Sequence, residues 1–142
     1  MKFSEKFQEF KNAIVTFLKQ GVTPAEIAFA VALGTFIAFI PMVGVHTALA
    51  FVFAWILRLN SLIVILGTQI SNPLTFPFQI FVSAQAGHLV MHGGLLTLTW
   101  SKDIDWVNTL LWPTLLGSLI LGIIFSISFY IGVYSFLKRR KR

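Results

Sequence analysis

Hydrophobic and polar positions follow two different patterns in this chain, one within the first 20 residues and another in the remainder. In the first segment, phenylalanine and aliphatic residues recur three or four positions apart, and Lys and Glu occupy positions between them. This spacing predicts an amphipathic helix over residues 1–20. Its apolar face fits a helix that lies in the membrane interface, and the same spacing also fits the seam of a coiled-coil dimer.

After Glu26 the chain consists of long blocks without charge. Lys, Arg, Asp and Glu are absent from residues 27–57, 59–101 and 106–137. A helix needs about 20 mostly apolar residues to cross a hydrocarbon layer about 30 Å thick. The pattern therefore predicts an all-α, polytopic integral membrane protein, and the mean hydropathy of +0.82 agrees with this class.

Local start and stop signals divide the expected membrane core, residues 21–100, into short helices. Gly21 predicts a left-handed helix cap, and Thr23-Pro24-Ala25-Glu26 has the pattern of a capping box with proline in the first turn. Helices are expected at about residues 24–39, 45–57, 61–70 and 76–92. The first hairpin is predicted to be re-entrant or to span, since neither of its helices crosses comfortably alone. The structural breaks are assigned to Pro41, Gly44, Pro73 and Pro77.

The last part of the chain predicts a polar loop at residues 101–106, a transmembrane helix at 107–137 and a basic tail at 138–142. Five of the eleven Lys and Arg residues lie in this tail. The positive-inside rule places both basic termini on the cytoplasmic side of the inner (plasma) membrane and the polar loop on the other side. The core must then cross an odd number of times, as two short spans plus a broken span or as a re-entrant hairpin plus a broken span.

Small residues indicate where helices can approach closely. Ala30, Gly34 and Ala38 lie four positions apart in the first core helix, and the last helix carries a similar face. That face consists of Ser118, Gly122 and Ser126. A protein of 142 residues would need self-association to enclose a path, so a homo-oligomer is expected, with this face as one seam.

The two core halves share a short pattern. Leu33-Gly34-Thr35 is followed by Pro41, and Leu66-Gly67-Thr68 is followed by Pro73. A short helix, a proline break and a returning helix are expected in each half, as in transporters built from internal repeats. The simpler interpretation is that the prolines only shape compact hairpins.

Composition excludes several chemistries. The net charge of +6 is explained by the cytoplasmic tail, and nothing else in the chain is basic enough to follow nucleic-acid phosphates. Cysteine is absent, which excludes disulfides and thiolate chemistry. No nucleophile elbow, zinc-protease motif, phosphate-binding glycine loop or buried carboxylate pair is present, so neither an enzyme nor a cofactor is expected.

Polar residues near the breaks are the candidates for substrate binding. Arg58 is the one charge between Glu26 and Lys102, and it is either an interfacial anchor that snorkels or a contact for a phosphate or carboxylate group. Asn60 is expected to cap the following helix. The segment Ser71–Thr75 can satisfy backbone groups freed by the break or bind a polar substrate. The complete set is His46, Arg58, Asn60, Thr68, Ser71, Asn72 and Thr75.

Other polar residues within the apolar blocks have ordinary interpretations. His88 and His92 have the spacing of a metal-binding pair, but no Cys, Asp or Glu lies near them in the sequence, so no metal site is expected. Gln69, Gln79 and Gln85 are expected to bond to neighbouring helices.

Several motifs together resemble a bacterial membrane family catalogued as domain of unknown function 2062. The motifs are Gly21-x-Thr23-Pro24, Gly34-x-Phe36, Pro41-x-x-Gly44-x-His46-Thr47, Leu57-Arg58-x-Asn60, Gly67-Thr68 and Ser71-Asn72-Pro73-Leu74-Thr75-x-Pro77. The resemblance extends from about Gly21 to the C-terminus. Because similar domains are sometimes fused to glycosyltransferases, it implies, by analogy, work near lipid-linked substrates.

These patterns lead to two functional hypotheses. The first is transport or translocation of a small or lipid-linked anionic substrate, with membrane lipids as the surroundings and Arg58 at the cytoplasmic mouth. The second is a non-catalytic scaffold or partner subunit, with a glycosyltransferase or another envelope protein as partner. A convergence of the breaks on a polar cavity would favour the first hypothesis.

Overall fold

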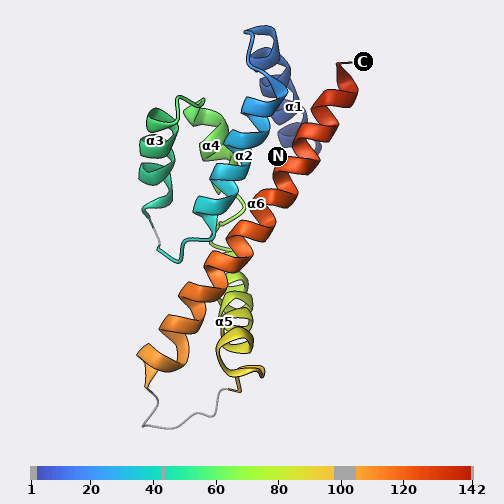
Figure 1. Ribbon diagram of the computed structural model, residues 1–142. Helices are drawn as coiled ribbons and strands as arrows, with labels where there is room; N and C mark the ends of the chain where they lie inside the picture. The colour runs from blue at the N-terminus through green and yellow to red at the C-terminus, as the bar shows by residue number, and fades with distance from the viewer. Residues whose placement is uncertain (1–2, 43, 98–104, 142) are drawn as a thin grey trace.

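The computed structural model describes residues 3–42, 44–97 and 105–141, and within them helices are the only regular secondary structure, without strands. Residues 101–104 of the expected polar loop lie outside the described residues. The all-α prediction is confirmed. The helices are α1 (Phe3–Lys19), α2 (Pro24–Ala38), α3 (His46–Ile56), α4 (Ser61–Thr68), α5 (Phe76–His92) and α6 (Trp112–Arg140), and a π-helical turn, η1 (Val107–Leu111), precedes α6 (Figure 1).

Short-range hydrogen bonds explain why these helices begin where they do. The capping box at the start of α2 is confirmed, because the Glu26 amide donates to Thr23 Oγ1 over 3.2 Å and the Thr23 amide donates to Glu26 Oε2 over 2.9 Å. Asn60 caps α4, with its Oδ1 accepting from the Leu62 amide over 3.0 Å, as expected. Gly21 has a φ of 87°, the left-handed conformation expected between α1 and α2.

The helices α2, α3 and α4 lie side by side at one end of the molecule, whereas α5 lies beyond α4 towards the other end (Figure 1). The chain therefore turns back at the first break, from α2 into α3, but continues in the same general direction at the second, from α4 into α5. The long α6 runs past both parts and packs on α2 and α5. The prediction of a returning helix in each half is thus wrong for the second half. There α5 continues away from α4 and packs on α6 instead of turning back beside α4.

Two glycines let α2 and α4 approach until their backbones touch. A Cβ atom added to Gly34 would collide with the carbonyl oxygen of Val64, and one added to Gly67 would lie 2.7 Å from the carbonyl oxygen of Val31. Val64 lies three positions before Gly67, and Val31 lies three positions before Gly34. The contact between the two helices is therefore nearly symmetric. The two Leu-Gly-Thr sequences of the predicted repeat therefore pack against each other.

A second crossing of the same type joins α5 to α6. A Cβ atom at Gly87 would collide with the carbonyl oxygen of Pro113, and one at Gly117 would collide with that of Ser83. Small residues at helix crossings increase van der Waals contact, which is the main attraction between helices in lipid. The Ser83 hydroxyl, buried at this crossing, has no hydrogen-bond partner among the described residues.

The small-residue face of α6 packs against α2 of the same chain. Gly122 lies under two aromatic side chains, with its Cβ position 3.2 Å from Phe39 Cβ and 3.3 Å from Phe36 Cδ2. Ser126 Oγ donates to the Ala32 carbonyl over 2.8 Å, while the Ser118 hydroxyl donates to Leu115 within α6. The expectation that this face is free as an oligomer seam is wrong, since α2 already covers it.

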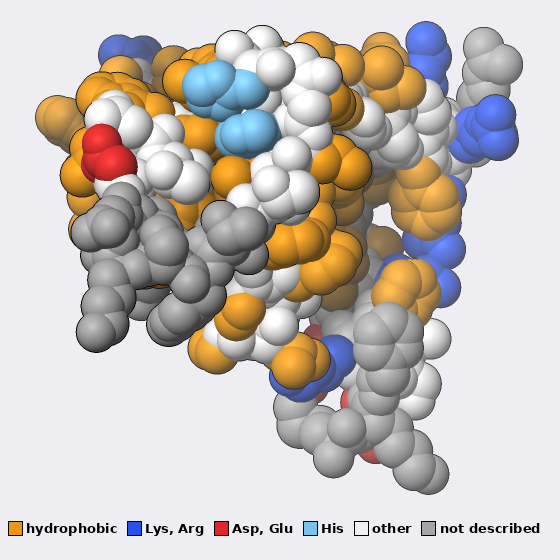
Figure 2. All heavy atoms as spheres, turned by 90° about the horizontal axis from the view of Figure 1, so that it is seen from below, with side chains coloured by type: hydrophobic (Ala, Val, Ile, Leu, Met, Phe, Trp, Pro, Cys, Tyr) orange, Lys and Arg blue, Asp and Glu red, His pale blue; other side chains and the backbone are white. Residues whose placement is uncertain are grey.

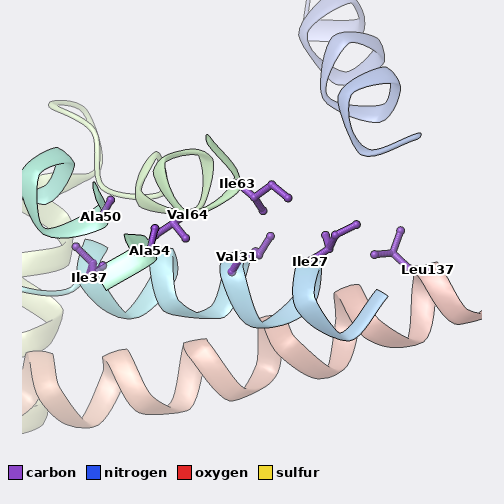
Figure 3. Close-up of a cluster of buried hydrophobic side chains, with 9 residues drawn as sticks. Ile27, Val31, Ile37, Ala50, Ala54, Ile63, Val64 and Leu137 are labelled. Atoms are coloured by element: carbon purple, nitrogen blue, oxygen red, sulfur yellow. The ribbon is translucent and has the colours of Figure 1, made fainter. Parts of the chain in front are cut away.

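The buried apolar cluster joins α2, α3, α4 and the end of α6. Val31 and Ile37 of α2 lie near Val64 of α4, whereas Ile27 lies near Leu137, which reaches the cluster from the last turn of α6 (Figure 3). The cluster also contains Ala30, Ala50, Ala54 and Ile63. The cluster holds the α2–α3–α4 unit against the C-terminal half of α6.

Many large apolar side chains are exposed. Figure 2 shows hydrophobic side chains spread over the face seen from below, among backbone and polar atoms, with Lys and Arg side chains near its margins. Trp55 is 82% exposed and Phe78 is 72% exposed. Among the described residues, Val107–Arg140 is the one helical segment that is long and apolar enough to cross a membrane.

Candidate functional site

The two chain breaks line one pocket, and the residues that they contribute to it are 25 or more positions apart in the sequence. Gly44 and His46 come from the first break, and the second supplies the other lining residues. Those residues are Ser71, Asn72, Pro73, Phe76 and Pro77. The pocket, called the break pocket below, has a volume of about 420 Å³. It forms because α3 turns back beside α4, which brings its first residues next to the α4–α5 turn.

The second break is built as a capping box. Asn72 Oδ1 accepts hydrogen bonds from the amides of Leu74 and Thr75, both over 3.0 Å. Thr75 Oγ1 accepts from the Asn72 amide over 3.1 Å and donates to the Ile70 carbonyl over 2.7 Å. Asn72-Pro73-Leu74-Thr75 thus repeats the reciprocal arrangement at the start of α2, here in the turn just before α5 begins at Phe76. Asn72 Oδ1 and the Thr75 hydroxyl are therefore engaged by the backbone.

Side chains also satisfy carbonyl groups that the first break leaves without helical partners. His46 Nε2–H donates to the Ile40 carbonyl over 2.8 Å. Gln79 Nε2 donates to the Ala38 carbonyl over 2.8 Å, which confirms its predicted bond to a neighbouring helix. Ala38 is the last residue of α2, so α5 closes the open end of α2. The sequence carries no local signal for this bond, because Gln79 and Ala38 are 41 positions apart.

A few polar groups at the break pocket keep their hydrogen-bonding capacity. Among the described residues, no hydrogen bond engages Asn72 Nδ2, Ser71 Oγ or the Nδ1 atom of His46. With Nε2 donating to Ile40, a neutral His46 presents Nδ1 as an acceptor, and a protonated one presents it as a donor. The described residues that line the pocket include no charged one. It can therefore bind a polar group through an amide, a hydroxyl and an imidazole.

Arg58 lies in a different pocket, at the turn between α3 and α4. This pocket of about 790 Å³ is also lined by Trp55, Leu59 and Ser61. His46 and Ile56 are the ends of α3, so Arg58 is about 15 Å or more from His46 along the helix axis at 1.5 Å per residue. The structure does not bring Arg58 to the break pocket.

The backbone of Arg58 adopts a conformation that favours glycine. Its φ is 54°, and it is the one non-glycine residue with positive φ in the described part of the chain. The Leu59 amide donates to the Ala54 carbonyl over 2.8 Å, which closes a Schellman-type cap around Arg58. Since a left-handed conformation costs an L-residue about 1–2 kcal/mol, an arginine at this position points to a use for its side chain.

The remaining candidates have structural positions. Thr68 is buried at the α2–α4 crossing, where its hydroxyl donates to the Ile65 carbonyl over 2.6 Å. Asn60 is the cap of α4. Neither residue lines the break pocket. The sequence pattern could not separate these residues from Ser71 and Asn72, because all of them are polar residues beside helix ends.

The other polar residues also bond mainly to backbone. His88 donates from Nδ1 to the Gly94 carbonyl over 2.7 Å, and its ring centre lies 4.6 Å from that of His92. Gln69 bonds within its own helix and Gln85 bonds to Leu96, so the expectation of bonds to neighbouring helices is wrong for both. The described residues contain no group of three or more His, Asp or Glu placed to hold a metal ion.

Comparison with known proteins identifies a family. The model of an uncharacterized protein family conserved in bacteria, DUF2062, matches residues 8–142. The chain belongs to the DUF2062 family. Searches of curated proteins and of solved structures give no match. The match confirms the resemblance expected from the motifs around the two breaks, and it covers every residue of the break pocket and the Arg58 turn.

Proposed function

We propose that the protein is a multi-pass protein of the bacterial inner membrane. The segment Val107–Arg140 has 34 residues, and 17% of its most apolar window is buried within the molecule, whereas the core helix of a soluble protein is mostly buried. Large apolar side chains are also exposed on α3, α4 and α5. Soluble monomers rarely expose contiguous apolar surface of this extent, so lipid is the natural surrounding medium.

The geometry supports one of the two topologies considered above. With 15 residues in α2 and 11 in α3, these helices measure about 22 Å and 16 Å, less than the hydrocarbon thickness of about 30 Å. They form a re-entrant hairpin that enters and leaves on the cytoplasmic side. The helices α4 and α5 form one broken crossing and α6 the return crossing. Both termini and Arg58 then lie on the cytoplasmic side.

The breaks also fit a location inside the bilayer. Backbone groups outside regular helices are tolerated at membrane depth only where protein or water satisfies them. At these breaks Asn72, Thr75, His46 and Gln79 satisfy backbone groups with their side chains. The N-terminal α1 lies at the cytoplasmic interface in this topology.

Within this topology the proposed activity is translocation of a small or lipid-linked anionic substrate, without catalysis. The convergence of the two breaks on one pocket carries this proposal. Transporters with discontinuous helices bind their substrates where such breaks meet. Ser71, Asn72 and His46 would bind the polar part of the substrate. Arg58 would receive its anionic group at the cytoplasmic surface, since a guanidinium suits phosphate and carboxylate. A homo-oligomer would complete the path through a surface other than the α2–α6 contact.

The first experiment separates substrate binding from helix capping at Asn72. Serine caps helices about as well as asparagine, so Asn72→Ser keeps the backbone bonds and removes Nδ2. The purified protein would be reconstituted in vesicles, and the flux of inorganic phosphate, phosphatidylglycerol and a polyprenyl phosphate would be measured. We expect Asn72→Ser to keep its folded stability and to lose about tenfold or more of the flux, about 1.4 kcal/mol.

The control is Ser128→Ala, because Ser128 is an exposed serine whose hydroxyl bonds within α6. Its flux should equal that of wild type. If folded wild-type protein transports none of these substrates, translocation of this substrate class is rejected. Unchanged flux in Asn72→Ser would remove Asn72 from the binding site.

Arg58 allows a second experiment, in which stability and activity move in opposite directions. Glycine adopts positive φ without strain. The free energy of unfolding of Arg58→Gly should therefore equal that of wild type or exceed it by up to about 1 kcal/mol. The same variant should lose flux of anionic substrates, and Arg58→Lys should keep part of it. Unchanged flux in Arg58→Gly would indicate that the side chain is only an interfacial anchor.

One observation favours the second candidate, a membrane scaffold or a partner subunit of an envelope or lipid-linked glycosylation system. Most polar groups at the breaks are engaged by the protein backbone, as a purely structural role requires. A scaffold predicts no flux from folded protein and recovery of a stoichiometric protein partner after mild solubilisation. Mass spectrometry of the lipids and proteins that co-purify with the chain would distinguish the two candidates.

A further inference from the structure

A groove lies between α1 and the last turns of α6, and it shares no lining residue with the break pocket. Its volume is about 630 Å³. The apolar part of its lining includes Phe7, Phe10 and Val15 of α1 with Val133 and Phe136 of α6. The cationic part consists of Lys11, Arg140 and Lys141. An apolar groove with cations at its edge matches a molecule that has a hydrocarbon chain and an anionic head.

The side chains that line this groove leave it uncovered. No α1 side chain that the structure describes is buried. Phe7 is 58% exposed and Phe136 is 55% exposed, although both line the groove. Gly132, also in the lining, has no atom within 4 Å of the position that its Cβ would occupy. The amphipathic helix therefore has room for an additional apolar group between itself and α6.

The basic tail divides between two faces of α6. The guanidinium carbon of Arg140 lies 5.4 Å from the centre of the Phe136 ring, which places this charge against the aromatic lining of the groove. Lys138 instead lies 5.6 Å from the centre of the Tyr134 ring, and Tyr134 does not line the groove. Arg140 and Lys141 thus belong to the groove, whereas Lys138 and Arg139 do not.

We infer that the groove binds one anionic phospholipid of the surrounding bilayer. Its acyl chain lies along Phe7, Phe10 and Phe136, and its phosphate lies near Arg140 and Lys141. The acyl chain covers apolar side chains of the groove that would otherwise face water at the interface, and their burial is favourable. The cations select an anionic head group over a zwitterionic one. The bound lipid connects α1 to α6.

The first test fills the groove. Gly132→Leu adds a side chain in open space, and leucine is a better helix former than glycine, so the variant is expected to fold. Native mass spectrometry of the full chain in detergent would measure binding of added phosphatidylglycerol, with phosphatidylcholine and inorganic phosphate as comparison ligands. Wild type should bind one phosphatidylglycerol in preference to both, and Gly132→Leu should lose this binding.

The second test compares two double variants, each of which removes two positive charges from the tail. Arg140→Gln with Lys141→Gln should weaken phosphatidylglycerol binding about thirtyfold, since each cation near an anionic lipid contributes about fivefold. Lys138→Gln with Arg139→Gln removes two positive charges from the adjacent positions outside the groove. This control should change binding no more than about threefold.

Other results would overturn the inference. Equal losses in the two charge variants would mean that the tail attracts anionic lipids without a defined site. Inorganic phosphate binding as tight as that of phosphatidylglycerol would indicate a free-anion site, and a dimer that Gly132→Leu dissociates would indicate a second copy of the chain in the groove. The translocation proposal has a separate readout, since these variants leave Asn72 and the break pocket unchanged.

Discussion

The glycine-lined helix crossings and the α1–α6 groove show opposite uses of small residues in one chain. At Gly34, Gly67, Gly87 and Gly117 an added Cβ atom would collide with or press against the backbone of another helix, whereas at Gly132 it would meet no atom within 4 Å. The crossings join apolar helices through direct backbone contact. The groove separates an amphipathic helix from the helix beside it.

In the proposed membrane topology this difference follows from the surroundings of each helix. Helices within lipid gain little from hiding apolar side chains, so close packing provides most of their attraction. An amphipathic helix at the interface obtains favourable burial from lipid itself. We therefore expect substitutions at the crossings to unfold the protein and those in the groove to leave its fold intact.

The largest effect is expected at the α5–α6 crossing. Gly87→Leu would insert a side chain where the Pro113 carbonyl lies, so the helices must separate. The expected loss is on the order of 3–5 kcal/mol, enough to prevent recovery of monodisperse protein. Size-exclusion chromatography and SDS-induced unfolding in micelles would measure it. Gly132→Leu is the matched control, and equal behaviour of the two variants would contradict the proposed difference between the regions.

A double-mutant cycle at the α2–α4 crossing should show coupling. Gly34→Ala and Gly67→Ala should each cost about 1–3 kcal/mol because each methyl group forces the backbones apart. The double variant should cost less than the sum, since the first methyl group already provides the separation that the second requires. Unfolding of the four proteins in SDS would measure the coupling. Strict additivity would show that the two glycines do not share one contact.

Two serines of α6 provide a smaller and sharper comparison. Ser126→Ala removes the hydrogen bond to the Ala32 carbonyl on α2 and should cost about 1 kcal/mol. Ser128→Ala removes a bond within α6 and should stay within about 0.5 kcal/mol of wild type. The same unfolding assay measures both. A larger loss for Ser128→Ala would contradict the assigned α2–α6 contact.

The smallest expected effect has the opposite sign. Gly132→Ala should stabilise the protein by about 0.5 kcal/mol, because alanine is the better helix former and the position is open. Thermal unfolding in detergent would detect it as a small rise in Tm. A clear destabilisation would show that α1 packs directly over Gly132.

Much of the local structure could be predicted from individual residues. Thr23, Pro24 and Glu26 act within one helical turn, so the start of α2 followed from the sequence, as did the cap at Asn60. The break beside Asn72 follows from its prolines, whereas the reciprocal bonds between Asn72 and Thr75 do not, because threonine stands where a capping box usually has Glu or Gln. The two Leu-Gly-Thr sequences, each followed by a proline, were the one pattern that suggested that His46 and Asn72 could line the same pocket.

The sequence by itself determined the helical class, the positions of most helix ends and the family, because proline, glycine and capping side chains act on the backbone within about four residues. Only the tertiary structure decided that the first break turns back while the second continues. It also decided that Ser126 bonds to α2, that Arg58 stands apart from the break pocket and that a groove remains beside α1. These features depend on which helix backbones touch, and that contact joins residues far apart in the chain.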